Sequence, residues 1–138
     1  MGHRRKSREL ALQMLFESEF YPEKTLVEQF NDFGVNFKVR SGILDFARTL
    51  FFGVKEHESD INKLLEHYSD HWKIHRMSFI DRNIIRLSLY ELLFIKDIPP
   101  SVSIDEAIEI AKHYGSEDSA AFVNGLLDKI FKKEILAA

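Results

Sequence analysis

The stretch that decides the fold is SFIDRNIIRLSLYELLFI, residues 78–95. Its apolar side chains recur at three- and four-residue spacing and leave little polar surface, which is typical of a helix buried on most sides. Ser78 and Asp81 are suited to cap its first turn. The pattern predicts a central, deeply buried helix from Ser78 to about Ile95, with the rest of the chain packed around it.

Three helical segments are predicted before this central helix, over residues 6–20, 26–33 and 38–68. The first should stop before Pro22, because proline cannot continue a helix from within. A T-x-x-E capping box formed by Thr25 and Glu28 opens the second, and Gly34 is expected to end it. The third is long, and a bend is expected near Gly53.

Two further helices are predicted after the central one. The Pro-Pro pair at 99–100 is expected to exclude helix there. Ser103 and Glu106 match a second capping box, and Gly115 is placed to terminate the helix that follows. Ser116 then opens the last helix. Because no alternating strand pattern or internal repeat is present, we expect an all-α fold.

Length and composition set the class of protein. With 138 residues and 45% apolar content, the chain is expected to form one compact domain of about six to seven helices over residues 1–138. The absence of cysteine excludes disulfides and zinc–thiolate sites. No secretory signal or membrane-spanning run is visible, so we expect a cytoplasmic protein without a membrane partner.

Positive charge is concentrated at the N-terminus. The first eight residues hold four of the 19 basic side chains, Arg4, Arg5, Lys6 and Arg8, and none of the 22 acids. The rest of the chain therefore carries 15 bases against 22 acids. Such a distribution favours a focused contact with a polyanion, since the acidic remainder repels phosphates elsewhere.

Two interpretations of residues 1–8 stay open. On a helical projection Arg4, Arg8, Ala11 and Leu15 share one line, which is apolar where it can pack and cationic where it leaves the core. That arrangement suits a nucleic-acid anchor. The alternative is a basic, flexible N-terminal arm that only keeps the protein soluble.

Motifs for catalysis are missing from the sequence. There is no G-x-S-x-G elbow, no glycine-rich phosphate loop and no metalloprotease helix, so we do not expect an enzyme or a cofactor. His67, His71 and His75 have the i, i+4, i+8 spacing that could hold a metal if the stretch were one helix. The neighbouring Trp72 instead favours a helix–helix connection in which the three rings diverge.

Motifs in the last third of the chain, IDEAIEIAK at 104–112 and FVNGLLDK at 122–129, carry a resemblance to a known family. With DRNIIRLSLYEL at 81–92 and the arginine-rich start before residues 11–13, the chain closely resembles the NusB family of bacterial transcription antitermination factors. The resemblance covers nearly the whole chain. It implies a fold of two packed helical subbundles, with the first three helices in one of them.

The resemblance also implies a function. Family members bind boxA RNA, a single-stranded element in leader transcripts of ribosomal RNA operons, together with the ribosomal protein NusE. The pair then joins an antitermination complex on RNA polymerase. Some members form homodimers that bury the RNA surface, so a homodimer is a further implied assembly.

Several residues match the family's RNA-binding positions. Arg4, Arg5, Lys6 and Arg8 match its arginine-rich motif and would neutralise phosphates. Asp118 matches a further family element. Two more candidates, Lys112 and Phe122, are proposed because they lie at the margins of the apolar faces of the last two helices.

Each of these three has a plainer interpretation. Phe122 is either a stacking platform for an unpaired base or simply part of the core. Lys112 either reaches the RNA or is merely solvated. Asp118 would hydrogen-bond a base, cap a helix or moderate affinity. Gly125, within a predicted helix, indicates close approach by a neighbouring helix or by RNA.

For the protein partner, the resemblance points to the surface of the central helix, with Asp81 and Arg82 exposed and available for charged contacts. Two other functions remain as alternatives. One is a protein–protein adaptor that does not bind RNA specifically, and the other is a metal-dependent enzyme built on the three histidines.

Overall fold

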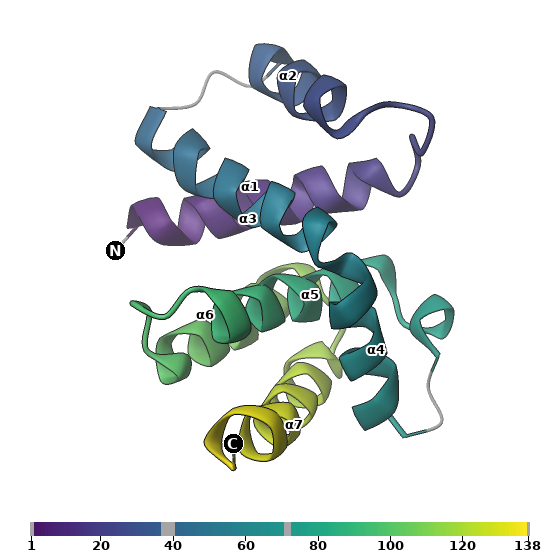
Figure 1. Ribbon diagram of the computed structural model, residues 1–138, viewed down its shortest axis with the longest axis vertical. Helices are drawn as coiled ribbons and strands as arrows, with labels where there is room; N and C mark the ends of the chain where they lie inside the picture. The colour runs from purple at the N-terminus through teal and green to yellow at the C-terminus, as the bar shows by residue number, and fades with distance from the viewer. Residues whose placement is uncertain (1, 37–40, 71–72, 138) are drawn as a thin grey trace.

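The computed structural model describes residues 2–36, 41–70 and 73–137, and over these ranges the chain is helical without any strand (Figure 1). Within the same ranges no helix is long and apolar enough to cross a bilayer. The expected all-α fold is confirmed. The elements are α1 (Gly2–Ser18), α2 (Leu26–Asn36), α3 (Ser41–Glu56), α4 (Glu58–Tyr68), a 3-10 turn (Ile74–Arg76), α5 (Phe79–Phe94), α6 (Pro100–Tyr114), α7 (Ser119–Ile130) and a π-helical turn (Phe131–Leu136).

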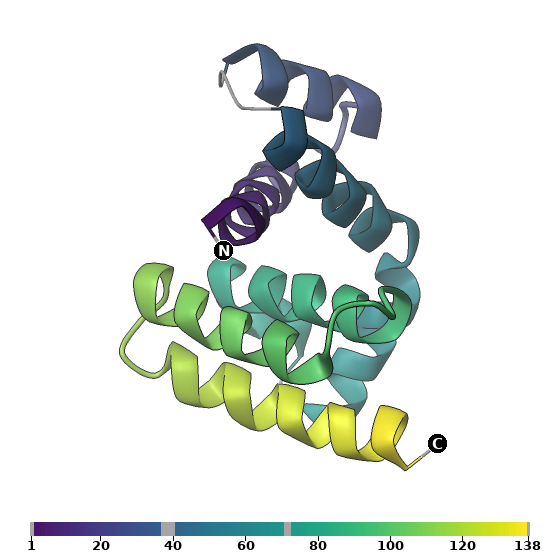
Figure 2. The same ribbon diagram turned by 90° about the vertical axis from the view of Figure 1, so that its left-hand side faces the viewer.

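The helices form two subbundles, as the family resemblance implied. Helices α1, α2 and α3 make one, and α4 to α7 make the other (Figure 2). Helix α5 contacts α6 and α7 within its own subbundle and also packs against α1 and α3 of the other. It is therefore the central helix predicted from its apolar pattern.

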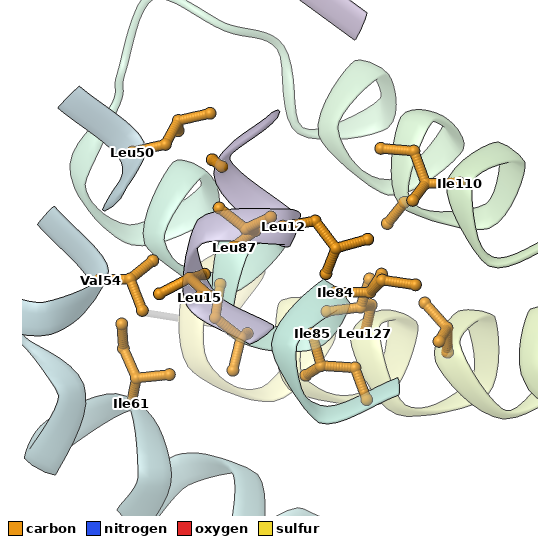
Figure 3. Packing of buried hydrophobic residues seen from close by; sticks show 14 of the residues in the cluster. Leu12, Leu15, Leu50, Val54, Ile61, Ile84, Ile85, Leu87, Ile110 and Leu127 are labelled. Carbon is orange, nitrogen blue, oxygen red and sulfur yellow. The ribbon is translucent and has the colours of Figure 1, made fainter. Parts of the chain in front are cut away.

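One continuous core joins the two halves. Helix α5 places Ile84, Ile85 and Leu87 into it from the centre. Figure 3 shows these side chains packed among apolar residues of both subbundles, including Leu12, Leu15, Leu50, Val54, Ile61, Ile110 and Leu127. Because non-polar surface from both halves is buried together, the subbundles are expected to fold as one cooperative unit.

Two predicted helix caps are present. The backbone N–H of Thr25 donates to Glu28 Oε1 at 3.0 Å, and that of Glu28 donates to Thr25 Oγ1 at 3.1 Å, which completes the capping box. At the start of α5 the backbone N–H of Asp81 donates to Ser78 Oγ at 3.0 Å. Both caps satisfy backbone donors that the first helical turn leaves unpaired.

The N-terminal basic residues are helical. Helix α1 begins at Gly2 rather than near Lys6, and these residues form the first two turns of a helix continuous with the core. It also ends at Ser18, two residues before the predicted end. Helix α2 passes through Gly34, which the sequence analysis had expected to end it, since one glycine costs a helix only about 1 kcal/mol.

The long predicted helix is broken at His57, between α3 and α4, and not near Gly53. Gly53 has a different role. A Cβ added there would lie 2.1 Å from Cζ of Tyr90, so only glycine lets α3 approach α5 this closely. The Tyr90 ring is held in place by stacking on Phe94, with ring centroids 5.5 Å apart.

Replacing Gly53 by alanine should lower the free energy of unfolding by about 1–2 kcal/mol. Displacing the Tyr90 ring costs roughly 1–3 kcal/mol, which outweighs the helix propensity gained. Gly125→Ala is the matched control, because a Cβ there meets nothing within 4 Å. It should stabilise by roughly 0.5–1 kcal/mol. Urea titration of both variants measures the change in the free energy of unfolding. Changes of the same sign in the two variants would contradict this account.

The start of α6 differs from the prediction. It begins at Pro100, with Pro99 at the N-cap, because proline at the first helical position lacks only an N–H that would have no helical partner. Ser103 and Glu106 therefore lie inside the helix and form no capping box. Their side chains are used in contacts with α1 and α5 instead.

Helix α7 also begins later than predicted, at Ser119, with Asp118 at the N-cap. Gly115 ends α6 as expected. The expectation that a neighbouring helix approaches Gly125 is wrong, since nothing lies within 4 Å of an added Cβ and the residue is exposed on α7.

Candidate nucleic-acid interface

The four N-terminal cations have different environments. Arg4, Arg5 and Lys6 are exposed on the first turns of α1, whereas Arg8 is only 4% exposed. Arg8 donates from Nε and Nη2 to the carboxylate of Glu91 at 2.7 and 2.8 Å, and from Nη1 to Glu106 at 3.4 Å. The predicted phosphate contact of Arg8 is therefore wrong, because its guanidinium already links the two subbundles.

Glu91 is the buried partner that the sequence analysis missed. It is 2% exposed, and the hydroxyl of Ser103 donates a further hydrogen bond to its Oε1 at 2.8 Å. A signal was present: Glu91 stands among the apolar residues at the end of this helix, and a buried glutamate needs a cation. Arg8 shares the helical line of the buried Ala11 and Leu15, which indicated where that cation would lie.

Arg5 makes a two-pronged contact with α6. Its Nε and Nη2 donate to the two carboxylate oxygens of Glu106 at 3.1 and 2.5 Å. This contact lowers the pKa of Glu106 and raises the pKa of Arg5. Arg5 remains exposed, so an RNA phosphate can reach it but must compete with the Glu106 carboxylate.

Arg4 is supported from α3. Its Cζ lies 4.0 Å from the ring centroid of Phe46, a cation–π contact that orients the guanidinium while it stays exposed. From the sequence, Phe46 is only one of the apolar residues that recur at helical spacing. Nothing in the local pattern predicts that it supports an arginine 42 positions earlier.

Lys112 lies on the helix that Arg5 contacts. It is exposed and pairs with Glu109 at 3.4 Å, and Glu109 also contributes to the raised pKa of Arg5. The structure therefore places Lys112 and Arg5 along one side of α6, with Glu106 and Glu109 between them. Acidic side chains therefore interrupt the predicted cationic surface between Arg5 and Lys112.

Asp118 and Phe122 lie together at the start of α7, and α6 lies between them and α1 (Figure 2). Phe122 is half-buried against the core, so part of its ring is accessible. Asp118 is exposed at the N-cap and its side chain makes no capping hydrogen bond, which removes the capping interpretation. A common face of these residues and Arg4 would therefore have to span three helices, and it stays a prediction.

The expected exposure of Arg82 is wrong. Arg82 is 8% exposed and its guanidinium pairs with Glu19, just beyond the end of α1. Burial alone would raise the pKa of Glu19, but hydrogen bonds from Arg82 and Asn83 bring that pKa below its ordinary value. The Arg82 side chain is long enough to reach from α5 to the end of α1. Asp81, the preceding residue, is half-buried.

An exposed aromatic patch adjoins Asp81, and we call it the Phe79 patch: Phe16, Phe20 and Phe79. The three rings pack with centroids 5.1–5.7 Å apart. Phe20 is 52% and Phe79 39% exposed, so apolar surface remains open to solvent. Sequence analysis missed the patch, although the i, i+4 spacing of Phe16 and Phe20 was a signal.

The predicted histidine row is not on one helix. Helix α4 ends at Tyr68 and Asp70 adopts a left-handed backbone with φ of 57°. His67 and His75 are both exposed, and His71 lies outside the described residues. Within the described ranges no group of residues is arranged to hold a metal ion. The helical spacing on which the metal alternative depended is therefore lost.

Comparison with known proteins agrees with this architecture. The model of the NusB family matches residues 5–132. A transcription antitermination protein NusB from Desulfitobacterium hafniense is 47% identical over 128 residues, covering 92% of this chain and 86% of the relative. The solved NusB of T. maritima is 43% identical, covers 94% of this chain and 91% of its own, and superposes with a TM-score of 0.84.

A second solved relative is a complex of the antitermination factors NusB and NusE with double-stranded RNA. Its matching chain is 27% identical, with a TM-score of 0.81 and coverage of 96% of this chain and 98% of that one. Family model, sequence relatives and solved structures thus agree over nearly the full length. The chain therefore belongs to the NusB family.

Proposed function

We propose that this chain is a transcription antitermination factor that binds single-stranded boxA RNA of ribosomal RNA leader transcripts together with NusE. The pair joins an antitermination complex on RNA polymerase in the cytoplasm. The chain acts by binding alone and catalyses no reaction. The name shared by its relatives and the solved complex of a relative with NusE and RNA support this function.

The observation that carries the proposal is the cationic end of α1. Arg4, Arg5 and Lys6 are exposed on two helical turns that continue into the core, on a chain that is acidic elsewhere. A fixed cluster of cations attracts a polyanion and restricts it to one place. Lys112 and the accessible part of Phe122 extend this surface with a further charge and a ring for an unpaired base.

Replacing Arg4, Arg5 and Lys6 by alanine should make binding of a boxA-like oligoribonucleotide less dependent on salt. Each phosphate neutralised on a single strand contributes about −0.7 to the slope of log K against log[salt], so the slope should flatten by about 2. Affinity at low salt should fall more than tenfold. Fluorescence anisotropy with NusE present, at salt concentrations from about 50 to about 300 mM, measures both the slope and the affinity.

The matched control removes three exposed lysines from other parts of the chain, Lys24, Lys63 and Lys73. It changes the net charge equally and should leave the slope within error of the wild type. A double-stranded RNA of the same sequence tests the preference for an unpaired strand. If the α1 variant and the control behave alike, the basic cluster is incidental and the adaptor alternative is favoured.

The protein partner is assigned to the Phe79 patch together with Asp81. Exposed aromatic rings supply buried area at low entropic cost when a protein docks, and a neighbouring carboxylate adds charge specificity. Arg82 makes a cation–π contact with this surface, since its Cζ lies 4.2 Å from the Phe79 ring centroid. NusE is the proposed occupant.

Replacing Phe20 and Phe79 by alanine should weaken NusE binding by at least about tenfold, because interface aromatics typically contribute 2 kcal/mol or more. RNA binding by the isolated chain should be unchanged, since the patch is far along α1 from Arg4. Calorimetric titration with NusE measures the loss. Val27→Ala on α2, which removes another exposed apolar side chain, is the control; an equal loss there would exclude the Phe79 patch as the docking surface.

A further inference from the structure

A pocket of about 470 Å³ opens between the first turns of α1 and the connection that leads from α5 into α6. Its apolar lining comes from Ile98, Pro99 and Val102. Val102 is 42% exposed, so part of this apolar lining is open to solvent. The volume lies within the roughly 300–1,000 Å³ typical of small-molecule sites.

Three arginines line the same pocket: Arg4, Arg5 and the buried Arg8. Arg8 is paired with Glu91, which leaves Arg4 and Arg5 for a ligand. Arg4 is oriented by the Phe46 ring, and Arg5 by the Glu106 carboxylate. The fork to Glu106 uses Nε and Nη2 of Arg5, and a guanidinium carries further N–H donors on its remaining nitrogen. The side chains of Arg4 and Arg5 are therefore already ordered at the pocket. Binding a phosphate costs them little further conformational entropy.

The pocket also contains two carboxylates that repel phosphate, and one of them, Glu106, is already paired with Arg5. Asp97, in the connection before α6, contributes an exposed carboxylate to the lining. A simple anion would suffer from this charge, whereas a nucleotide can place its phosphate on the arginines and turn its base toward the acid. Every nucleobase carries an N–H donor on its Watson–Crick edge that a carboxylate can accept.

We propose that this pocket holds one nucleotide of the bound RNA, with its base against Ile98, Pro99 and Val102 and its phosphate on Arg4 and Arg5. The inference rests on the proposed RNA-binding function and assigns to it a base-binding subsite. A base inside a duplex cannot enter such a pocket because it is stacked and paired, whereas an unpaired base can. The pocket would therefore be one source of the preference for single strands.

The test combines a protein variant with a scan of the RNA. Val102→Gln replaces an apolar wall by a polar one without adding charge. A boxA-like oligoribonucleotide is prepared as a series in which each nucleotide in turn is abasic, and binding is measured with full-length protein and NusE. For the wild type, one position should stand out, with a loss of about tenfold, in the range found for single stacked bases.

The V102Q variant should bind the intact RNA about fivefold more weakly and should lose the extra sensitivity at that position, a coupling that a double-mutant cycle isolates. Val27→Gln, at another exposed valine, should keep the wild-type profile. If no position stands out for the wild type, or if V102Q keeps the same profile, the subsite is overturned.

Failure of the inference and failure of the function are distinguishable. Salt-dependent binding that requires Arg4, Arg5 and Lys6, but with a flat abasic profile, contradicts only the subsite. If no RNA of the series binds with or without NusE, the proposed function and the subsite are both overturned. Thermal melts of V102Q and V27Q establish that both are folded, and the wild-type abasic scan decides the question independently of either variant.

Discussion

Replacing Arg8 by alanine should lower the free energy of unfolding by about 3–5 kcal/mol, the cost of breaking a buried ion pair from one side. The substitution leaves the Glu91 carboxylate buried, with Ser103 still donating one hydrogen bond to it. An uncompensated charge in that position cannot be hydrated without opening the contact between the subbundles. Chemical denaturation followed by circular dichroism measures the loss.

Two further variants separate charge from packing. Arg4→Ala removes an exposed arginine one turn earlier on α1 and should change stability by less than about 1 kcal/mol. The double variant R8M/E91L replaces both charges by apolar side chains of similar size and should recover most of the lost stability. If R8A is as stable as R4A, Arg8 does not link the subbundles as its contacts indicate.

Replacing Glu19 by alanine should cost about 2–3 kcal/mol, somewhat less than a fully buried pair because water can still reach this carboxylate. Glu19 accepts hydrogen bonds from Arg82 and from Asn83, the latter at 2.6 Å, and lies 3.6 Å from Arg86. Without it, two largely buried guanidinium groups of α5 face each other. Glu17→Ala removes an exposed acid from the same end of α1 and is the matched control.

The same residue predicts a dependence on pH. Because the pKa of Glu19 is lower in the folded than in the unfolded chain, its contribution is fully present above the unfolded pKa and is lost as pH falls through the folded pKa. Wild-type stability should therefore decline below about pH 4.5. The decline should be shallower in E19Q, and identical acid profiles would contradict this assignment.

The local parts of the fold could be predicted from the sequence. The apolar pattern of residues 78–95 identified the central helix, and the capping residues Thr25, Glu28 and Ser78 were assigned correctly because each acts within one turn of its own position. The starts of α1 and α6 were missed. At α1 the early start accompanies contacts of Arg4 and Arg5 with α3 and α6, whereas at α6 the signal was local, because proline suits the first helical position.

The polar contacts between helices could not be predicted in the same way. Arg8 pairs with Glu91 and Arg82 with Glu19, over separations of 83 and 63 residues, so neither periodicity nor capping rules reveal them. A family resemblance assigns such residues by position and gives no information about their burial. Two charged side chains interpreted as binding residues therefore proved to connect the subbundles, while Phe46 and Glu106 gained roles in presenting Arg4 and Arg5.

Helix α1 carries the cationic residues at its start and Phe16 of the Phe79 patch near its end. Its 17 residues span about 25 Å at 1.5 Å per residue, which sets a fixed spacing between the transcript and the protein partner. Both ligands can be held at once without competing for surface. Inserting a single residue between them would rotate one end by about 100° relative to the other. The helix therefore fixes both the distance and the relative direction of the two surfaces.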